Sequence, residues 1–122
     1  MIMNYDKKNV FAKIINGEFS SEKIYEDDMM LIIKDKYPDS RYNTHLLCMP
    51  KGEFIDFNDF VSKADKFFIG GFFAKLCDIL EKISIKEYKL ITNNGAKAGQ
   101  EIFHFHIHIK SHDEMILNRE LL

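Results

Sequence analysis

The chain has 122 residues, 46% of them hydrophobic and 30% charged, and its 17 Lys and Arg against 19 Asp and Glu leave a net charge of -2. This length suits one core, so we expect a single domain over residues 1–122. Because the two signs of charge are interspersed, and neither a membrane-length apolar run nor an apolar leader is present, we expect a cytoplasmic protein whose main partner is neither nucleic acid nor a membrane.

The first half of the chain predicts one short helix and three strands. Apolar residues within 10–15 have the spacing of an amphipathic helix, and Asn9 stands where an N-cap is needed. Two strands follow on either side of an acidic turn, and Asp35 ends the second. The third strand, "THLLCMP", places His45 at its start.

The second half predicts a long helix over residues 62–83, where apolar residues recur at steps of three and four. Gly70-Gly71 in its middle indicates a kink or a close packing contact. A strand "EYKLITN", a loop "NGAKAGQ" and a histidine strand reaching about Ile109 follow. We therefore expect an α+β fold: a mostly antiparallel five-stranded sheet with one short N-terminal and one long central helix.

Two cysteines, Cys48 and Cys77, lie far apart in the chain and within apolar stretches. Such surroundings favour reduced thiols over a disulfide. We expect both to be buried.

Three histidines occupy alternate positions in "EIFHFHIHIK". Alternate residues of a strand share a face, so His104, His106 and His108 form one row, opposite a row of Phe and Ile. Such a row suits either a metal or nucleophilic chemistry on phosphorus. Alternate side chains on a flat strand are about 7 Å apart, whereas zinc ligands each lie about 2.0 Å from one ion, so this spacing argues against three-histidine metal binding.

A neutral imidazole can attack phosphorus and form a phosphoramidate that water later cleaves. Neighbouring imidazoles can fix the tautomer of the nucleophile and donate hydrogen bonds to phosphate oxygens. The preceding "NNGAKAGQ" loop offers backbone N–H groups and small residues that allow a phosphate to approach.

The segment "HFHIHIK", together with "FAKIINGEFSSEKIYEDD" and "THLLCMPKGE", resembles the histidine triad (HIT) family, with similarity over nearly the whole chain. The resemblance implies a homodimer that hydrolyses or transfers nucleoside monophosphates. It implies the following roles: His106 as the nucleophile that becomes a nucleotidyl-histidine, His104 and His108 as its supports, His45 as a pocket residue, Asp35 as the ligand of the ribose hydroxyls, and Asn93, Gly99 and Gln100 as the phosphate loop.

Several positions depart from the family pattern. Glu101, which we include among the nucleotide-binding residues, follows the Gly-Gln pair at the position where the phosphoramidase branch has a serine that would help the leaving amine depart. Lys110 replaces the last apolar residue of the motif. Asn9 and Ala12 replace a frequent Cys-x-x-Cys, so we expect no metal and no other cofactor. The stretch from Asp35 to His45 is about two residues longer than usual, and the C-terminal tail is short.

The leading hypothesis is a hydrolase acting on the α-phosphate of purine nucleoside monophosphate conjugates of the phosphoramidate type. Two alternatives remain: a dinucleoside polyphosphate hydrolase of the same fold, and a nucleotide-binding module with little turnover. Phe11 and Ile33 are candidates for an apolar nucleobase slot. Apolar residues beyond the main stripe of the long helix (Phe67, Ile69 and Phe73) further indicate a dimer.

Overall fold

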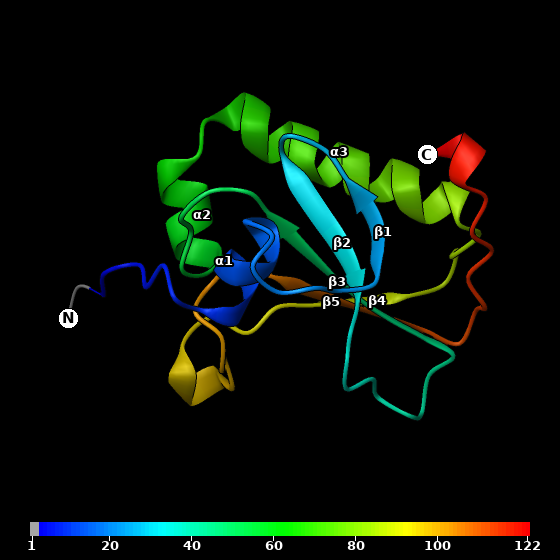
Figure 1. Cartoon of the computed structure of the whole chain (residues 1–122), viewed down its shortest axis with the longest axis horizontal. Coiled ribbons are helices and arrows are strands. Elements are labelled where there is room, and N and C mark those ends of the chain that lie inside the picture. The colour runs from blue at the N-terminus through cyan, green and yellow to red at the C-terminus, as the bar shows by residue number, and fades with distance from the viewer. Residues whose placement is uncertain (1–2) are drawn as a thin grey trace.

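The computed structural model describes residues 3–122, and its centre is a five-stranded sheet in the order β1-β2-β3-β5-β4 (Figure 1). Every neighbouring pair of strands is antiparallel. The bounds are Lys23–Glu26 for β1, Met30–Lys34 for β2, Thr44–Pro50 for β3, Lys89–Ile91 for β4 and Ile107–Ser111 for β5. The expected α+β class and antiparallel five-stranded sheet are confirmed.

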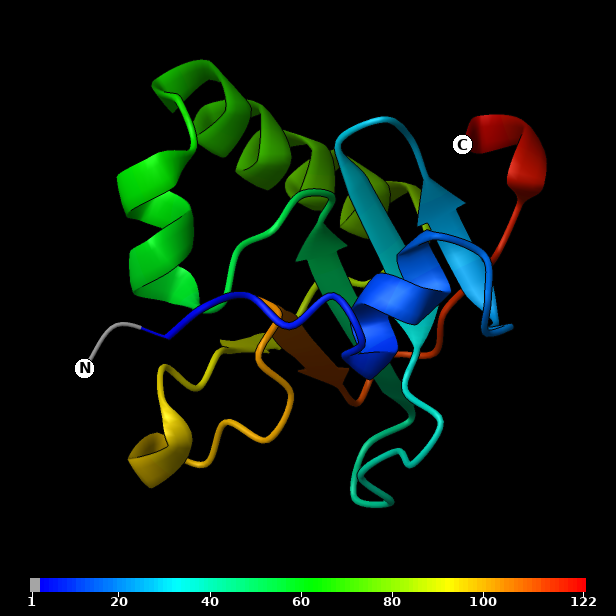
Figure 2. The ribbon, with the colours of Figure 1, turned by 60° about the vertical axis from the view of Figure 1, so that its left-hand side comes forward.

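The described chain has three α-helices, and they lie on both faces of the sheet (Figure 2). The short helix α1 (Val10–Ile15) packs on one face, and α2 (Phe57–Lys63) and α3 (Lys66–Lys82) pack on the other. Asn9 caps α1 as expected, because its side chain accepts the N–H of Ala12 at 2.9 Å. The described chain therefore has three layers, with the sheet in the middle.

The hydrophobic core is divided between the two faces, because successive side chains of a strand point to opposite sides. On the α2 and α3 side, Phe60 stacks on Phe105 with ring centroids 4.9 Å apart, and Phe72 packs beside them. The α1 side holds a smaller cluster from α1, β2 and β3: Phe11, Ile14, Leu31, Ile33, Leu47 and Met49. His45 shares the face of this smaller cluster, two residues before Leu47 on β3.

The long central helix expected over 62–83 is confirmed as α3, but it begins at Lys66. Residues 62 and 63 belong to α2, and Ala64 and Asp65 separate the two helices. Asp65 has extended backbone, and its side chain accepts the N–H of Phe68, so it starts α3 as an N-cap. Within α3 the chain packs closely at Gly71: a Cβ there would lie 3.1 Å from Cε of Met29.

The histidine strand also differs from expectation, since β5 begins at Ile107 and excludes His104 and His106. The register pairs Cys48 with Ile107, and its continuation would set Phe105 opposite Pro50, which has no N–H for a ladder bond. Phe105 instead donates its N–H to the carbonyl of Phe54 at 2.7 Å. Likewise β4 covers three residues, fewer than the segment "EYKLITN".

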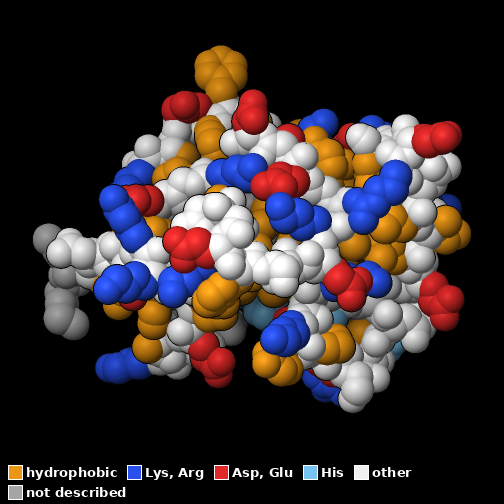
Figure 3. All heavy atoms as spheres, in the orientation of Figure 1, with side chains coloured by type: hydrophobic (Ala, Val, Ile, Leu, Met, Phe, Trp, Pro, Cys, Tyr) orange, Lys and Arg blue, Asp and Glu red, His pale blue; other side chains and the backbone are white. Residues whose placement is uncertain are grey.

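Both cysteines are free thiols, as expected, but only Cys48 is buried. Cys77 is exposed, because it lies on the outer side of α3, one residue after Leu76, which faces the core. Burial raises the pKa of the Cys48 thiol. Acidic and basic side chains are interspersed over the face of the molecule shown in Figure 3. Within residues 3–122 we find no helix with the length and apolar character needed to cross a membrane.

After β5, the C-terminal tail runs to the β1 edge of the sheet, which is opposite the β4 edge. It ends in a 3-10 helix, Arg119–Leu121, near β1 (Figure 1). The guanidinium of Arg119 donates to the carbonyls of Lys23 and Ile24 at 2.8 and 3.0 Å. β1, which forms this edge and pairs with β2, is irregular: its register shifts between Lys23 and Tyr25.

Candidate functional site

Four of the five histidines form a continuous row on the α1 face of the sheet. His106 and His108 have ring centroids 5.2 Å apart, shorter than the flat-strand spacing, because His106 lies before the start of β5. The rings of His108 and His45, which come from β5 and β3, are also 5.2 Å apart. His112 is exposed, as expected, and stacks on Tyr42 outside this row.

His104 is the buried end of the row, with no exposed surface. Its Nε2 lies 2.8 Å from the carbonyl oxygen of Pro50, which can only accept, so Nε2 carries the proton. Its Nδ1 then accepts the hydroxyl of Tyr5 at 2.7 Å. With both ring nitrogens engaged, His104 supports its neighbours and has no free atom for a substrate.

His106 has one engaged and one free ring nitrogen. Nδ1 lies 2.6 Å from the carbonyl oxygen of His104, so Nδ1 carries the proton and Nε2 carries the lone pair. No residue of 3–122 makes a hydrogen bond to Nε2. Phe11 of α1 contacts the ring edge to face at 4.8 Å, and the hydroxyl of Thr92 binds the backbone carbonyl of His106 at 2.7 Å. These contacts fix the direction in which the free nitrogen points.

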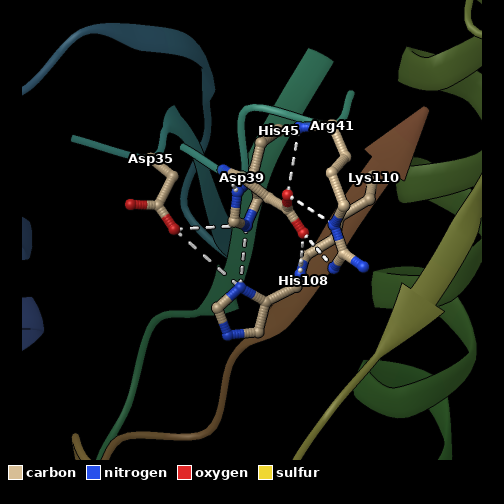
Figure 4. A network of polar contacts seen from close by, with 6 residues as sticks. All are labelled: Asp35, Asp39, Arg41, His45, His108 and Lys110. Atoms are coloured by element: carbon tan, nitrogen blue, oxygen red, sulfur yellow. Dashed lines mark hydrogen bonds and ion pairs between the residues drawn. The ribbon is translucent and has the colours of Figure 1, made fainter. Parts of the chain in front are cut away.

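His45, His108 and Asp35 point toward one another at the other end of the row (Figure 4). The backbone N–H of Asp39 donates to Nδ1 of His45 at 2.9 Å, so the proton of neutral His45 is on Nε2. This Nε2–H has two acceptors, Nδ1 of His108 at 2.9 Å and Oδ2 of Asp35 at 3.2 Å. His108 accepts at Nδ1, so its own proton is on Nε2, away from Asp35.

The burial of this row keeps all four imidazoles neutral at pH 7. Desolvation lowers the pKa of His104 and of His108 to about 4, and for His108 the neighbouring His106 and His45 act in the same direction. Burial also lowers the pKa of His106 and of His45, opposed at both by the charge of Asp35. Neutral imidazole is the form that can act as a nucleophile or donate a single directed hydrogen bond.

Asp35, His45 and His108 also meet the distance condition for a metal site, since one ligand atom from each lies within 4.8 Å of the others. A metal would need the lone pair of His45 Nε2. That nitrogen carries a proton because Nδ1 accepts from the backbone of Asp39. The tautomer of His45 therefore argues against metal binding, a stronger reason than the flat-strand spacing.

The loop before the triad is held mainly by its own hydrogen bonds. Buried Gln100 donates from Nε2 to the carbonyls of Ile55 and Ile102 and accepts the N–H of Gly95. Gly99 has φ +94°, a conformation that favours glycine, and its N–H donates to Ala96. In this conformation the N–H groups of Gly95, Gly99 and Gln100 donate hydrogen bonds to acceptors within the loop itself, so they are not free to bind a phosphate.

Asn93 and Glu101 complete the site residues named from the sequence. The side chain of Asn93 lies beside Gly99, where a Cβ would stand 3.4 Å from Nδ2. Glu101 is exposed and makes no hydrogen bond or ion pair with the described part of the chain. The structure therefore brings together the four histidines with Asp35, while Glu101 stays apart from this hydrogen-bonded group.

Four contacts in this region were not predicted from the sequence. Tyr5 and the carbonyl of Pro50 bind the two sides of His104, while the backbone of Asp39 binds His45 and its carboxylate binds Lys110 at 3.1 Å. Of the residues that make these contacts, only Lys110 stood out in the sequence, as a charged residue where the triad motif has an apolar one. The others depend on contacts between segments far apart in the chain.

Comparisons with known proteins bear on the family and the fold of the chain. The family model described as "Scavenger mRNA decapping enzyme C-term binding" matches residues 8–121. An uncharacterized HIT-like protein of Rickettsia prowazekii is 48% identical over 107 residues, which are 86% of this chain and 88% of the relative.

Solved structures give the same result for the fold. A HIT-like protein has a TM-score of 0.76 at 38% identity and covers 86% of this chain and 99% of its own. A HIT family hydrolase from Clostridium thermocellum has a TM-score of 0.71 at 32% identity and covers 87% and 91%. The fold is therefore of the hydrolase type found in these neighbours, and the chain belongs to the histidine triad (HIT) family.

Proposed function

We propose that the protein is a nucleotide hydrolase or transferase that attacks the α-phosphate of purine nucleoside monophosphate conjugates of the phosphoramidate type. His106 is the nucleophile in this proposal. The observation that carries it is the hydrogen bond of 2.6 Å from His106 Nδ1–H to the carbonyl oxygen of His104. This bond leaves the Nε2 lone pair free in a ring that burial keeps neutral.

The reaction has two displacements at phosphorus. In the first, Nε2 of His106 forms a bond to the α-phosphorus, and the bond to the leaving group breaks. The leaving group departs with the electron pair and takes up a proton. In the second, water attacks the nucleotidyl-histidine, the N–P bond breaks, and its electron pair returns to Nε2 as water loses a proton.

His108 is the residue we assign to the phosphate oxygens. Its Nδ1 accepts from His45, so Nε2–H is its remaining donor, and the side chain is 25% exposed. A preorganised donor stabilises the negative charge that develops on phosphoryl oxygens. We assign ribose binding to Asp35, whose Oδ1 accepts the N–H of Tyr37 and whose Oδ2 faces the two imidazoles.

Mass spectrometry after brief incubation with an adenylylated amine tests the covalent step. We expect a mass increase of one adenylyl group, located on His106 and absent from the His106→Gly variant. Steady turnover with no adduct at any quench time, or an adduct on another residue, would contradict the assignment.

The leaving group separates this proposal from its alternatives. Purified protein is offered an adenylylated amine and a diadenosine polyphosphate at equal concentration, and kcat/KM is measured for each. A higher kcat/KM for the amine conjugate supports the phosphoramidate class. A preference for the polyphosphate would replace it with the dinucleoside polyphosphate class, and tight mononucleotide binding without turnover would indicate a binding module.

A homodimer belongs to the same proposal. β4 is an edge strand with Leu90 48% exposed, and Phe67 at the start of α3 is 92% exposed. Ile69 and Phe73 are partly buried against the core of the same chain, so they offer less uncovered surface than the sequence indicated. Sedimentation equilibrium tests the dimer, and a monomer at micromolar concentration would contradict it.

A further inference from the structure

The loop between β2 and β3 is tied to β5 through the carboxylate of Asp39. This carboxylate accepts Nη2 of Arg41 at 2.7 Å and Nζ of Lys110 at 3.1 Å (Figure 4). Arg41 is two residues away in the same loop, whereas Lys110 comes from β5. The hydrogen bonds from Arg41 hold the pKa of Asp39 well below its usual range, so it stays charged.

Lys110 lies on the same face of β5 as His108, two residues along the strand, and its register partner on β3 is His45. The side chains of Lys110 and Asp39 are 19% and 15% exposed, so this pair is better shielded from solvent than a surface ion pair. It therefore fixes the loop at a point directly beside His45 and His108.

The same residue, Asp39, donates its backbone N–H to His45 Nδ1 at 2.9 Å. That bond requires His45 to be the Nε2–H tautomer, which donates to Nδ1 of His108 at 2.9 Å. His108 must then hold its proton on Nε2. Three contacts are thus linked in series. The Lys110–Asp39 ion pair holds the loop, the loop fixes the tautomer of His45, and His45 leaves Nε2–H of His108 as the free donor.

We propose that Lys110 and Asp39 are positioning residues that set the tautomer of His108 through His45. This inference deepens the proposed function, because it depends on His108 donating from Nε2 to a phosphate oxygen. If the loop moved away, His45 would lose the N–H that selects its tautomer. His108 would then populate the Nδ1–H form, with an Nε2 lone pair facing the negatively charged phosphate.

The clamp, meaning the Lys110–Asp39 ion pair together with the bond from Asp39 N–H to His45, holds the loop of residues 35–43 that connects β2 to β3. A longer loop has more conformations to lose on ordering, and an ion pair to the neighbouring strand opposes that loss. The ion pair from Lys110 therefore offsets part of the entropy cost of ordering this loop.

The test compares Lys110→Met with Lys89→Met. Lys89 is the register partner of Lys110 on β4 and lies 5.7 Å from the ring of Tyr42, which Lys110 also approaches, at 6.0 Å. Both substitutions remove one positive charge from the same face, so the pair separates the clamp from a general attraction of anionic substrates. Lys110→Arg keeps the charge and serves as the rescue variant.

Histidine ¹⁵N chemical shifts at pH 7 report the tautomer of each ring. We expect His45 and His108 to be Nε2–H forms in the wild type, in Lys89→Met and in Lys110→Arg, and mixed tautomers in Lys110→Met and Asp39→Asn. In the adenylylated-amine assay we expect kcat to fall roughly 10-fold in the latter two, with little change in KM, because a directed donor is lost in part. The double variant should be no worse than either single one.

An unchanged His108 tautomer in both Lys110→Met and Asp39→Asn would overturn the inference, and so would an equal loss of kcat in Lys89→Met. Thermal unfolding of each variant identifies a loss of kcat that comes from unfolding. Because the tautomer is measured without substrate, it is independent of turnover. A wild-type protein without turnover would refute the proposed function, while the ¹⁵N shifts would still decide whether the clamp exists.

Discussion

His106 donates Nδ1–H to the carbonyl oxygen of His104, two residues earlier, at 2.6 Å. This contact orients the ring of one triad histidine by the backbone of another, and it forms because this segment leaves the ladder before β5 starts. In a regular strand, that carbonyl would be directed at a neighbouring strand. The break in the strand is thus part of how the free nitrogen of His106 is presented.

Replacing His106 with Gly is expected to lower kcat by roughly four orders of magnitude or more, since the covalent route loses its nucleophile. Mononucleotide affinity should change by less than about 10-fold, because ribose and phosphate contacts come from other residues. Single-turnover kinetics and calorimetric titration measure the two effects. His112→Gly is the matched control, and wild-type turnover in His106→Gly would refute the assignment.

The acid limb of kcat/KM is expected below pH 6.5. Protonation of His106 removes its lone pair, and burial places its pKa below the ordinary value of 6.5, while the pKa of His108 is lowered to about 4. The rate constant should therefore reach half of its plateau value only below pH 6.5. A pH–rate profile with circular dichroism at each pH checks this, and a half-maximal rate at or above pH 6.5 would contradict it.

Stability should also fall with acid through His104. The unfolded chain binds a proton near pH 6.5, whereas folded His104, whose pKa is about 4, does not, so the free energy of unfolding drops as pH falls from 6.5 toward 4. Between pH 7.5 and pH 5 the wild type should lose about 2 kcal/mol more than His104→Gln. Urea denaturation at both pH values measures this, with His112→Gln as the control. Equal losses in wild type and His104→Gln would show that His104 is not the group responsible.

Two adjacent glycines in α3 should respond differently to alanine. A Cβ at Gly70 meets nothing within 4 Å, so Gly70→Ala should stabilise the fold by about 0.5–1 kcal/mol through helix propensity. A Cβ at Gly71 would lie 3.1 Å from the flexible end of Met29, so displacement of that side chain should offset part or all of the gain. Chemical denaturation compares the two, and a larger gain for Gly71→Ala would contradict the packing argument.

Zinc is expected not to bind stoichiometrically at Asp35, His45 and His108. The Nε2 of His45 carries a proton as long as Asp39 N–H occupies Nδ1. Equilibrium dialysis at pH 7 should leave well below one zinc ion per chain, and a chelator should not reduce turnover. One ion per chain, lost in His45→Asn, would show that the tautomer can be overcome.

The sequence predicts the parts of the fold that depend on local patterns. Asn9 as the cap of α1, Asp35 at the end of β2 and His45 at the start of β3 all follow from residue type and position within a few neighbours. The start of α3 at the N-cap Asp65 was not predicted, because apolar residues at helical spacing continue from 64 to 83 across it.

The remaining features depend on pairing between distant segments. His104 and His106 precede the strand because a continued register between β3 and β5 would set Phe105 opposite Pro50, and this register is fixed only when β3 and β5 pair. Likewise the tautomers of His45 and His104 depend on the backbone N–H of Asp39 and the carbonyl of Pro50, which no periodicity connects to the triad. The sequence could name the candidate site histidines, but not which ring nitrogen of each is free.

Arg119 has a consequence for how sheets of this protein can join. By donating to the carbonyls of Lys23 and Ile24, it occupies acceptors that a strand from another molecule would need at β1. This contact disfavours strand addition at β1, and β4 is the other edge of the sheet. Two copies that meet through the same edge form an isologous pair with no open edge left, so growth stops there and cannot continue into a filament.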